Sequence, residues 1–391
     1  MAEGRERAMD KLVVEGGREL DGTVRAAGAK NAVLPAMAAA LLTDGPLVLR
    51  GAPRLSDVST MQSVLSALGV DASSTDEEDG TRTLQLIGGG EIHPEAGWDY
   101  VRKMRGSICV LGPLVAKVGR AEVSLPGGCV FGVRPIDVHL KGLEALGARV
   151  RIEHGMIVAE APDGGLRGSE LYLGTAFGSS VTGTMNVMMA AALARGTTVI
   201  HGAACEPEVE ELGRCLLAMG AGVSGLGSPR LEINGGDRLH GAEHRVMPDR
   251  IETGTYLVAG AITGGRVRVV GCVPEHLSAL VDRLREAGFG VERGDDWVEV
   301  QPVGYGTRPR PTDVTTQPFP GFPTDLQAQW MALMCRSDGV SLITERIYPD
   351  RYMHLPELVR MGARIRRQEA IAIVQGNHRL SGAHVTASDL R

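Results

Sequence analysis

The sequence has few aromatic residues, no closely spaced cysteine pair and no long hydrophobic run. Aromatic side chains make up 4% of the 391 residues, so we expect a core of aliphatic side chains. The longest apolar stretch, Ala32 to Leu42, has 11 residues, whereas a membrane-spanning helix needs roughly 20. The opening segment MAEGRERAMDK lacks the apolar region of a signal peptide, which predicts a cytoplasmic protein.

The cysteines form neither a disulfide framework nor a zinc motif. In a chain of this length, scattered cysteines are typical of free thiols in a reducing compartment. The six residues are Cys109, Cys129, Cys205, Cys215, Cys272 and Cys335.

The charge balance gives no sign of a nucleic-acid or membrane partner. Lys and Arg total 41 and Asp and Glu total 47, a net charge of −6. A basic excess is the usual footprint of nucleic-acid binding, and it is missing here. Hydrophobic residues at 43% and charged residues at 23% are typical of a globular protein, and the length suits two domains.

One phrase recurs along the chain: an amphipathic helix that ends in a hydrophobic residue and Gly, followed by a strand. Its copies include LSALGV, LEALGARV and LREAGFGV. Glycine there suits the left-handed residue that ends a helix. The spacing of 68 to 78 residues predicts repeated structural units. The glycines that end the helices are Gly69, Gly147, Gly220, Gly288 and Gly362.

A second kind of helix precedes each phrase and is apolar nearly all round, as in TMNVMMAAALA, which predicts that it is buried. Each unit therefore reads as a buried helix, a strand, an exposed helix and one or two strands. Five units are complete. A sixth begins at RLSGAHVTASDLR, and the period predicts a further helix–strand–helix beyond Arg391. We expect a chain without that unit to be less stable and poorly active.

Several familiar motifs are absent or misplaced. Gly220, Gly222 and Gly225 spell GxGxxG, but they follow a helix and enter a strand, which favours a cap and turn over dinucleotide binding. The chain has no GxxxxGK[ST] phosphate loop, HExxH motif or close cluster of His, Asp and Glu. We therefore expect neither a cofactor nor a metal ion.

The segment LPGGCVFGVRPIDVHLKGLEALGA (125–148) carries the sharpest chemical signal. Its two glycines let backbone N–H groups approach an anion closely. Cys129 follows directly, and Arg134 is five residues on; a thiol beside a cation has a lowered pKa and becomes reactive. Arg134 and Asp137 are also candidates to hold a polar ligand. The alternative is a buried loop cysteine with an ordinary surface arginine.

Two further segments have chemical potential. In GAKNAVLP (28–35), Lys30 and Asn31 at the start of a buried helix would surround a phosphate or carboxylate; the alternative is a capping Asn beside a solvated Lys. In PGFPTDLQAQ (320–329), Asp325 is a candidate general base, or simply an N-cap. Lys30 and Cys129 lie in the first half of the chain and Asp325 in the second, so one substrate reaches all three only if the halves meet.

Together, GAKNA, LPGGC to RPIDVHLKG, PDRIETGT (248–255) and GFPTDLQAQ resemble the enolpyruvyl transferases. The resemblance runs from Met9 onward and is closer to the branch that uses UDP-N-acetylglucosamine than to the branch that uses shikimate. It implies an α/β fold of two domains, each built from three helix–strand units in an inside-out α/β barrel. We expect one domain over 30–247 and the other over 1–29 plus 248–391, with the active site between them.

The resemblance also implies a reaction and a set of site residues. The enolpyruvyl group of phosphoenolpyruvate would move to the sugar 3-hydroxyl with release of phosphate, the first committed step of peptidoglycan synthesis. Cys129 would protonate the enol carbon, Asp325 would take the hydroxyl proton, and Lys30 would complete the catalytic set. The groups around phosphoenolpyruvate would be Lys30, Asn31, Arg134 and Arg391. The nucleotide-sugar site would comprise Arg105, Arg134, Pro135, Ile136, Asp137, Val138, Gly178, Ser179, Ser180, Val181 and Ile347.

Two other functions stay open. One is a non-catalytic paralogue that binds the nucleotide sugar and regulates wall synthesis, and the other is an enolpyruvyl transferase with a different acceptor. The joint presence of Cys129, Asp325 and Lys30 favours the enzyme, because a binding protein has no physical need for all three. The sequence also departs from the family at Gly178, where many members have Lys or Pro, and at Thr182, where Gly is frequent.

Overall fold

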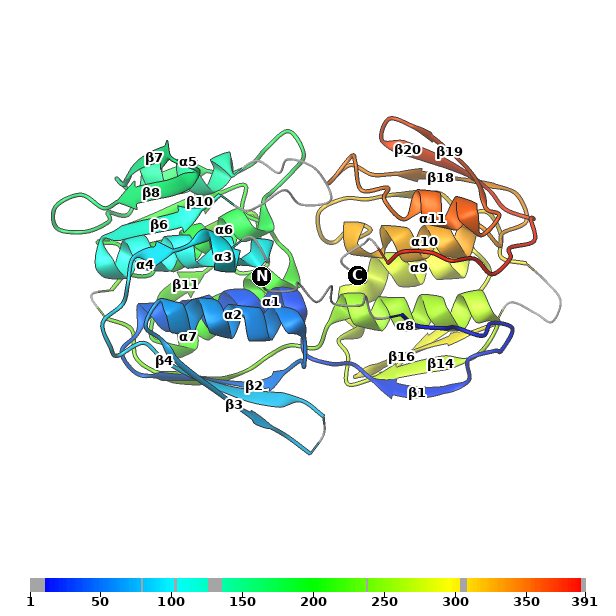
Figure 1. Ribbon diagram of the computed structural model, residues 1–391, viewed down its shortest axis with the longest axis horizontal. Coiled ribbons are helices and arrows are strands. Elements are labelled where there is room, and N and C mark those ends of the chain that lie inside the picture. Colours follow the sequence, from blue (N-terminus) through cyan, green and yellow to red (C-terminus); the bar gives the residue numbers. More distant parts are fainter. Residues whose placement is uncertain are drawn as a thin grey trace, which may run out of the picture.

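The computed structural model describes residues 11–78, 80–101, 104–125, 136–236, 238–302 and 308–387, with residues 99, 100 and 105 described by their backbone alone. These residues form two lobes side by side, with sheets on the outside and helices between them (Figure 1). Each lobe has its own hydrophobic core: the first core runs from Val33 to Val246 and the second from Ile251 to Val374. We use first lobe and second lobe for the elements around these cores.

The described residues contain five separate four-stranded sheets, one for each predicted unit. The strand orders, in unit order, are β13-β2-β4-β3, β5-β6-β8-β7, β9-β10-β12-β11, β1-β14-β16-β15 and β17-β18-β20-β19. In every sheet the first pair is parallel and the other two pairs are antiparallel. The prediction of repeated units is therefore confirmed.

The strands follow one plan. The parallel edge strands are β13 (Ala242–Arg245), β5 (Glu95–Ala96), β9 (Glu170–Tyr172), β1 (Gly22–Arg25) and β17 (Val314–Thr315). Beside them lie β2 (Pro46–Ala52), β6 (Arg120–Ser124), β10 (Thr197–His201), β14 (Val267–Val270) and β18 (Val340–Thr344). The hairpins that complete the sheets are β3 (Asp71–Asp76) with β4 (Arg82–Ile87), β7 (Arg149–Glu153) with β8 (Met156–Glu160), β11 (Gly222–Ser224) with β12 (Arg230–Asn234), β15 (Gly290–Arg293) with β16 (Trp297–Gln301), and β19 (Arg364–Gln368) with β20 (Ile371–Gln375).

The apolar helices lie largely inside the lobes, as predicted, because most of their residues pack against other elements. They are α1 (Lys30–Ala38) with η1 (Ala39–Leu42), η2 (Arg105–Val110) with α4 (Leu111–Val118), α6 (Val181–Ala191), α8 (Arg250–Thr263), and η4 (Thr324–Leu326) with α10 (Gln327–Met334). The second helices are α2 (Ser56–Ala67), α5 (Asp137–Ala145), α7 (Pro207–Ala218), α9 (Ser278–Glu286) after η3 (Pro274–Leu277), and α11 (Leu355–Arg360); α3 (Trp98–Val101) is a short addition.

The second helices are not uniformly exposed. The glycines that end them all have a left-handed φ between 92° and 101°, which confirms their capping role. However, α7 is largely buried, and its buried residues include Glu208 and Glu211. These carboxylates accept hydrogen bonds from Arg250 and from the backbone of Met247, at the boundary between the lobes. The prediction of an exposed helix is therefore wrong for most of α7, because the face with Glu208 and Glu211 meets Arg250 and the crossover segment instead of water.

Two crossover segments connect the lobes. Residues 26–29 lead from β1 in the second lobe to α1 in the first, and residues 246–249 lead from β13 in the first lobe to α8 in the second. The two segments run antiparallel: the Ala29 N–H donates to the Met247 carbonyl at 2.7 Å, and the Asp249 N–H donates to the Ala27 carbonyl at 2.8 Å. Elsewhere among the described residues, the lobes meet through packing and side-chain contacts.

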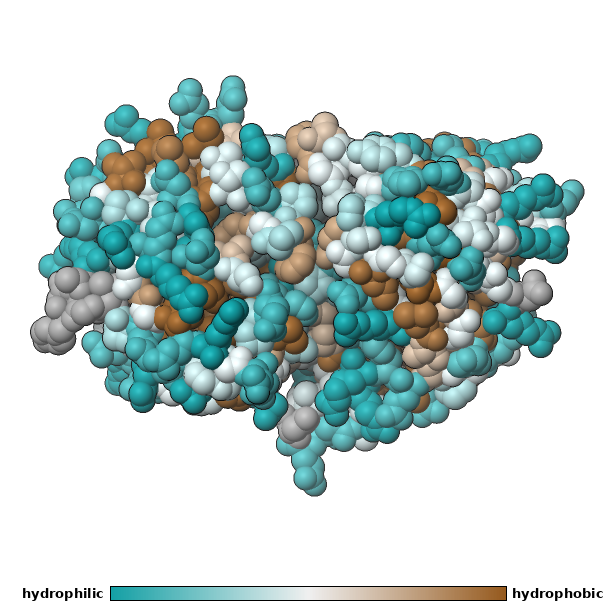
Figure 2. Space-filling view, turned by 180° about the vertical axis from the view of Figure 1, so that it is seen from behind, coloured by the Kyte–Doolittle hydropathy of each residue, from teal (hydrophilic) through white to brown (hydrophobic). Residues whose placement is uncertain are grey.

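The surface is mixed in character. Seen from the face opposite to Figure 1, the hydrophobic residues form patches separated by hydrophilic side chains (Figure 2). None of the helices in the described part of the chain has the length and hydrophobicity that crossing a bilayer requires.

Candidate active site

Asp325 lies in η4, just before α10, at the boundary with the first lobe. Its Oδ2 accepts a hydrogen bond from Asn31 Nδ2 at 3.1 Å, and its Oδ1 accepts one from Arg351 Nη1 at 2.5 Å. The Asp325 side chain is 23% exposed and the Arg351 side chain 4% exposed. The carboxylate is therefore held in one orientation and stays partly accessible, which suits a general base that must come within hydrogen-bond reach of a substrate proton. The alternative of an N-cap is wrong, because Pro323 and Leu326 occupy the cap positions of η4 and α10.

Lys30 and Asn31 form the first turn of α1. Ala29 is the N-cap and has no side chain with which to cap, so the alternative of a capping Asn is also wrong. The Asn31 amide instead crosses to Asp325 in the second lobe. Lys30 Nζ lies 2.6 Å from Asp57 Oδ2, and the two side chains are 19% and 28% exposed. The ammonium is thus half-buried and held by Asp57 near the helix start, where the Lys30 N–H donates to Asp249 Oδ2 at 3.1 Å, as the positive end of a helix favours.

The two segments expected to bind the nucleotide sugar lie side by side in the first lobe. Ile136 is the N-cap of α5, and Ser180 is the N-cap of α6, where its Oγ accepts from the Gly183 N–H at 3.2 Å. A Cβ built on Gly183 would lie 2.8 Å from both Ser180 Oγ and Val138 Cγ1. Two helix starts, those of α5 and α6, therefore converge at one place, which suits an anionic ligand such as a diphosphate.

Gly178 has a structural reason to be glycine. Its φ is +101°, and a Cβ at this position would lie 2.7 Å from Pro318 Cγ in the second lobe. Both the backbone conformation and the close contact therefore oppose a side chain here. A lysine, a residue expected at this position in many members of the family, would block this contact between the lobes.

The remaining predicted site residues are placed only in part. Ile347 is near the carboxyl end of β18, where its N–H donates to Glu345 Oε1 at 2.8 Å. Asp137 is the first residue of α5, Ser179 and Val181 flank the cap of α6, and Arg105 opens η2. The predictions for Cys129, Arg134, Pro135 and Arg391 concern residues outside the described ranges.

The structure adds polar residues that the sequence analysis missed. Arg351 binds Asp325, Asp57 pairs with Lys30, and Glu208 pairs with Arg250 across the lobes. Arg250 lies in the PDRIETGT segment, which carries the family resemblance but gave it no role, and the other three residues stand in none of the quoted motifs, so only contacts in space identify these pairs. The GxGxxG motif, in contrast, behaves as predicted: Gly220 ends a helix and Gly225 sits in a turn before β12.

Most of the described cysteines are poor nucleophiles. Burial raises the pKa of Cys109 and of Cys215 to about 12, and that of Cys335 to about 11. A thiol with so high a pKa is almost wholly protonated at neutral pH and reacts slowly. Burial also raises the pKa of the other two described thiols, Cys205 and Cys272, so a reactive thiolate is not favoured at any of the five described cysteines.

Known proteins resemble this chain in sequence and in fold. A family model described as EPSP synthase (3-phosphoshikimate 1-carboxyvinyltransferase) matches residues 14–391. A UDP-N-acetylglucosamine 1-carboxyvinyltransferase of Rhodospirillum centenum is 49% identical over 391 residues, 98% of this chain and 89% of the relative. One from Anaeromyxobacter sp. strain K is 51% identical over 383 residues, with the same two shares.

Among solved structures, the enolpyruvyl transferase NikO from Streptomyces tendae has a TM-score of 0.80 at 22% identity and covers 92% of this chain and 83% of that one. An EPSP synthase from Acinetobacter baumannii has a TM-score of 0.64 at 19% identity, covering 93% and 83%. At these identities the likeness shows the fold alone. It confirms the expected two-lobed arrangement of helix–strand units.

The matching family model and the named relatives show that the chain is an enzyme of the transferase class. The chain belongs to the enolpyruvyl transferase family, as the sequence motifs indicate. Within it, the relatives that share half of their residues with this chain are UDP-N-acetylglucosamine 1-carboxyvinyltransferases.

Proposed function

We propose that this protein transfers the enolpyruvyl group of phosphoenolpyruvate to the 3-hydroxyl of UDP-N-acetylglucosamine and releases phosphate. The names of the relatives support the substrates. The observation that carries the proposal is the hydrogen bond between Asn31 and Asp325, because it joins the anion-binding start of α1 to a carboxylate of the other lobe. This arrangement lets one substrate meet groups from both lobes.

The chemistry follows from the charges involved. The sugar hydroxyl is a weak nucleophile until a base takes its proton. We assign this task to Asp325, and the hydrogen bonds from Arg351 and Asn31 that orient its carboxylate support the assignment. The hydroxyl oxygen bonds to C2 of phosphoenolpyruvate while an acid protonates C3, a role we assign to Cys129. Loss of a C3 proton and cleavage of the C2–O bond to phosphate then restore the enol ether.

The negative charge of phosphoenolpyruvate calls for cations that are fixed in advance. Lys30, held by Asp57, is one of them, and we assign Arg134 and Arg391 to the same task. The convergent starts of α5 and α6 near Val138 and Ser180 suit the diphosphate of the nucleotide sugar. Arg105, Pro135 and Ile347 complete the proposed nucleotide-sugar site. Side chains supply all the positive charge in this scheme, so it needs neither metal nor cofactor.

We further propose domains at 30–247 and at 1–29 plus 248–391. The break between the two hydrophobic cores, after Val246 and before Ile251, supports this division. The pairing of β1 with β14 supports the assignment of the amino-terminal strand to the second domain. We place the protein in the cytoplasm, as the first committed enzyme of peptidoglycan synthesis, with consequences for cell wall biogenesis, cell shape, cell cycle and cell division.

Phosphate release tests the proposal. The purified protein, given phosphoenolpyruvate and UDP-N-acetylglucosamine, should release phosphate and form one enolpyruvyl ether, identified by mass. Asp325→Asn should lower kcat by about 100-fold or more, because it removes the base. The control Asp282→Asn changes an exposed carboxylate on α9 and should have no effect.

The outcome also separates the alternatives. Phosphate release with another hydroxylated acceptor, and not with UDP-N-acetylglucosamine, would show a different transferase. Binding of the nucleotide sugar without turnover with any acceptor would show a non-catalytic paralogue. Rapid alkylation of Cys129 by an epoxide analogue of phosphoenolpyruvate such as fosfomycin, with protection by phosphoenolpyruvate, would support the acid role of that thiol.

A further inference from the structure

A polar cluster joins the lobes beside the proposed active site. Glu206 and Glu208 stand at the start of α7 in the first lobe, and Arg250 and Phe319 belong to the second. Arg250 Nε and Nη2 donate to the two Glu208 oxygens at 2.9 and 3.2 Å. The Arg250 guanidinium also lies 5.6 Å from the centre of the Phe319 ring. In addition, the Phe319 N–H donates to Glu206 Oε1 at 3.2 Å.

The segment 318–325 connects this cluster to the proposed base. At one end, Pro318 lies against Gly178, so that a Cβ there would come within 2.7 Å of Pro318 Cγ. At the other end is Asp325. Short backbone hydrogen bonds fold the segment tightly: the Gly321 N–H donates to the Pro318 carbonyl at 2.9 Å, and the Leu326 N–H to the Pro323 carbonyl at 3.0 Å. The position of the Phe319 backbone is therefore coupled to that of Asp325 through the residues between them, which make internal hydrogen bonds.

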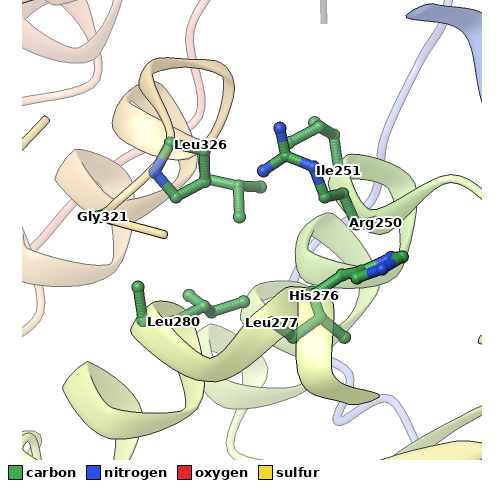
Figure 3. Close-up of a pocket in the computed structure, with 9 residues that line it drawn as sticks. Arg250, Ile251, His276, Leu277, Leu280, Gly321 and Leu326 are labelled. Carbon is green, nitrogen blue, oxygen red and sulfur yellow. The ribbon is translucent and has the colours of Figure 1, made fainter. Parts of the chain in front are cut away.

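The second lobe itself holds the later part of the segment, where the Phe322 ring packs edge-on against Trp330 and Thr324 Oγ1 donates to Glu345 Oε2 at 2.9 Å, whereas the earlier part borders a pocket. Figure 3 shows a pocket between Leu326 and Gly321 on one side and Arg250, His276 and Leu280 on the other. Because this pocket lies between the segment and its neighbours, packing there does not fix the segment fully. The His276 ring meets the Phe319 ring edge-on, with centroids 6.4 Å apart. The directional bond to the Phe319 backbone comes from Glu206 in the opposite lobe.

Glu206 is unusual for a carboxylate in a protein interior. Its side chain is buried, and its Oε2 has no hydrogen-bond partner among the described residues. Burial raises the pKa of this carboxyl, even though the Phe319 N–H and the charge of Arg250 act in the opposite direction. A buried carboxyl is costly to keep unless it makes a specific contact. The bond to the Phe319 N–H is the contact that this position provides.

We propose that Glu206 is a positioning residue: by binding the Phe319 N–H from the opposite lobe, it fixes segment 318–325 and thereby places Asp325 against Asn31. Glu206 touches neither substrate in this account. The inference rests on the proposed function, in which Asp325 is the base. It assigns to Glu206 an effect on turnover rather than on the capture of either substrate.

Three variants test the role of the hydrogen bond. Glu206→Ala removes the acceptor, and Glu206→Gln keeps an acceptor oxygen in the same place without a charge. Glu210→Ala is the matched control, because Glu210 lies one turn along α7 and pairs with the exposed Arg214. Steady-state phosphate release gives kcat and the KM of each substrate, and a thermal melt gives the stability of each variant.

We expect Glu206→Ala to lower kcat about tenfold, which corresponds to about 1.4 kcal/mol of transition-state stabilisation, with the KM for phosphoenolpyruvate within about twofold of wild type. Glu206→Gln should recover kcat to within about twofold of wild type, and Glu210→Ala should match wild type. A loss of stability alone would not produce this split between kcat and KM, nor its rescue by glutamine.

The outcomes separate the two levels of the argument. Wild-type kcat in Glu206→Ala, or a Glu206→Gln variant as slow as Glu206→Ala, overturns the positioning role while the proposed function stands. A wild-type protein that releases no phosphate with any acceptor overturns the proposed function, and the role of Glu206 with it. Equal losses in Glu206→Ala and Glu210→Ala would show a general effect on α7 and would also overturn the inference.

Discussion

The ion pair between Glu208 and Arg250 offers a stringent test of how the lobes are held together. The Glu208 and Arg250 side chains are 3% and 9% exposed and make two hydrogen bonds with each other. Burial by itself lowers the pKa of Arg250, but the charge and hydrogen bonds of Glu208, together with the charges of Glu206 and Asp325, raise it on balance. The guanidinium therefore stays charged, and its partner is essential.

The expected energies follow from this burial. Glu208→Gln leaves the buried guanidinium without full compensation, and breaking a buried pair in this way costs about 3–5 kcal/mol. The double variant Glu208→Leu with Arg250→Met removes both charges and keeps similar volume. It should therefore lower the free energy of unfolding much less than the sum of the losses from Glu208→Leu alone and Arg250→Met alone. We expect a coupling energy of about 2 kcal/mol or more between the two positions.

Urea unfolding measures these free energies. Tryptophan fluorescence, to which the buried Trp330 contributes together with Trp98 and Trp297, and circular dichroism both follow the unfolding. As a control, Glu210→Gln breaks a pair whose arginine is 64% exposed and should cost about 1 kcal/mol at most. A Glu208→Gln variant no less stable than this control, or single and double changes that are strictly additive, would refute the reasoning.

Three further predictions concern other parts of the molecule. Iodoacetamide at pH 8 should leave Cys109, Cys215 and Cys335 unlabelled in the folded protein, because their raised pKa values keep these thiols protonated. Fast labelling of any of the three would contradict their burial. Asn186→Leu should destabilise the first lobe by about 2–4 kcal/mol in urea unfolding, because the buried amide accepts from the Gly112 N–H at 2.6 Å and donates to the Ile108 carbonyl at 2.7 Å. An unchanged urea midpoint would count against this prediction. Because burial raises the pKa of Glu206, folding favours its protonated form, and the stability that this group adds at low pH is lost as the pH rises from the ordinary pKa of 4.5 through the raised pKa. Glu206→Gln should flatten this part of the curve of unfolding free energy against pH. An identical slope in both proteins would oppose the prediction.

The repeated units were predictable because their signals are local. A helix that is apolar all round must be buried, a glycine after a helix ends it in the left-handed region, and a strand follows. Five copies of this pattern gave five sheets with one strand order. The placement of the edge strands was less accessible, since β13 joins β2 almost 200 residues earlier in the chain and only the packed lobe shows that pairing.

The residues of the proposed site were likewise predictable from the sequence only in part. The residue types and motifs of the sequence by themselves singled out Lys30, Asn31 and Asp325, because an ammonium at a helix start and a lone carboxylate in a cleft have recognisable chemistry. Only the tertiary structure decided that Asn31 meets Asp325 across 294 residues, that Arg351 orients the same carboxylate, and that Glu206 holds Phe319. Sequence patterns report the period of one element and the face it buries. Contacts between lobes depend on how two finished surfaces fit, and no local period records that fit.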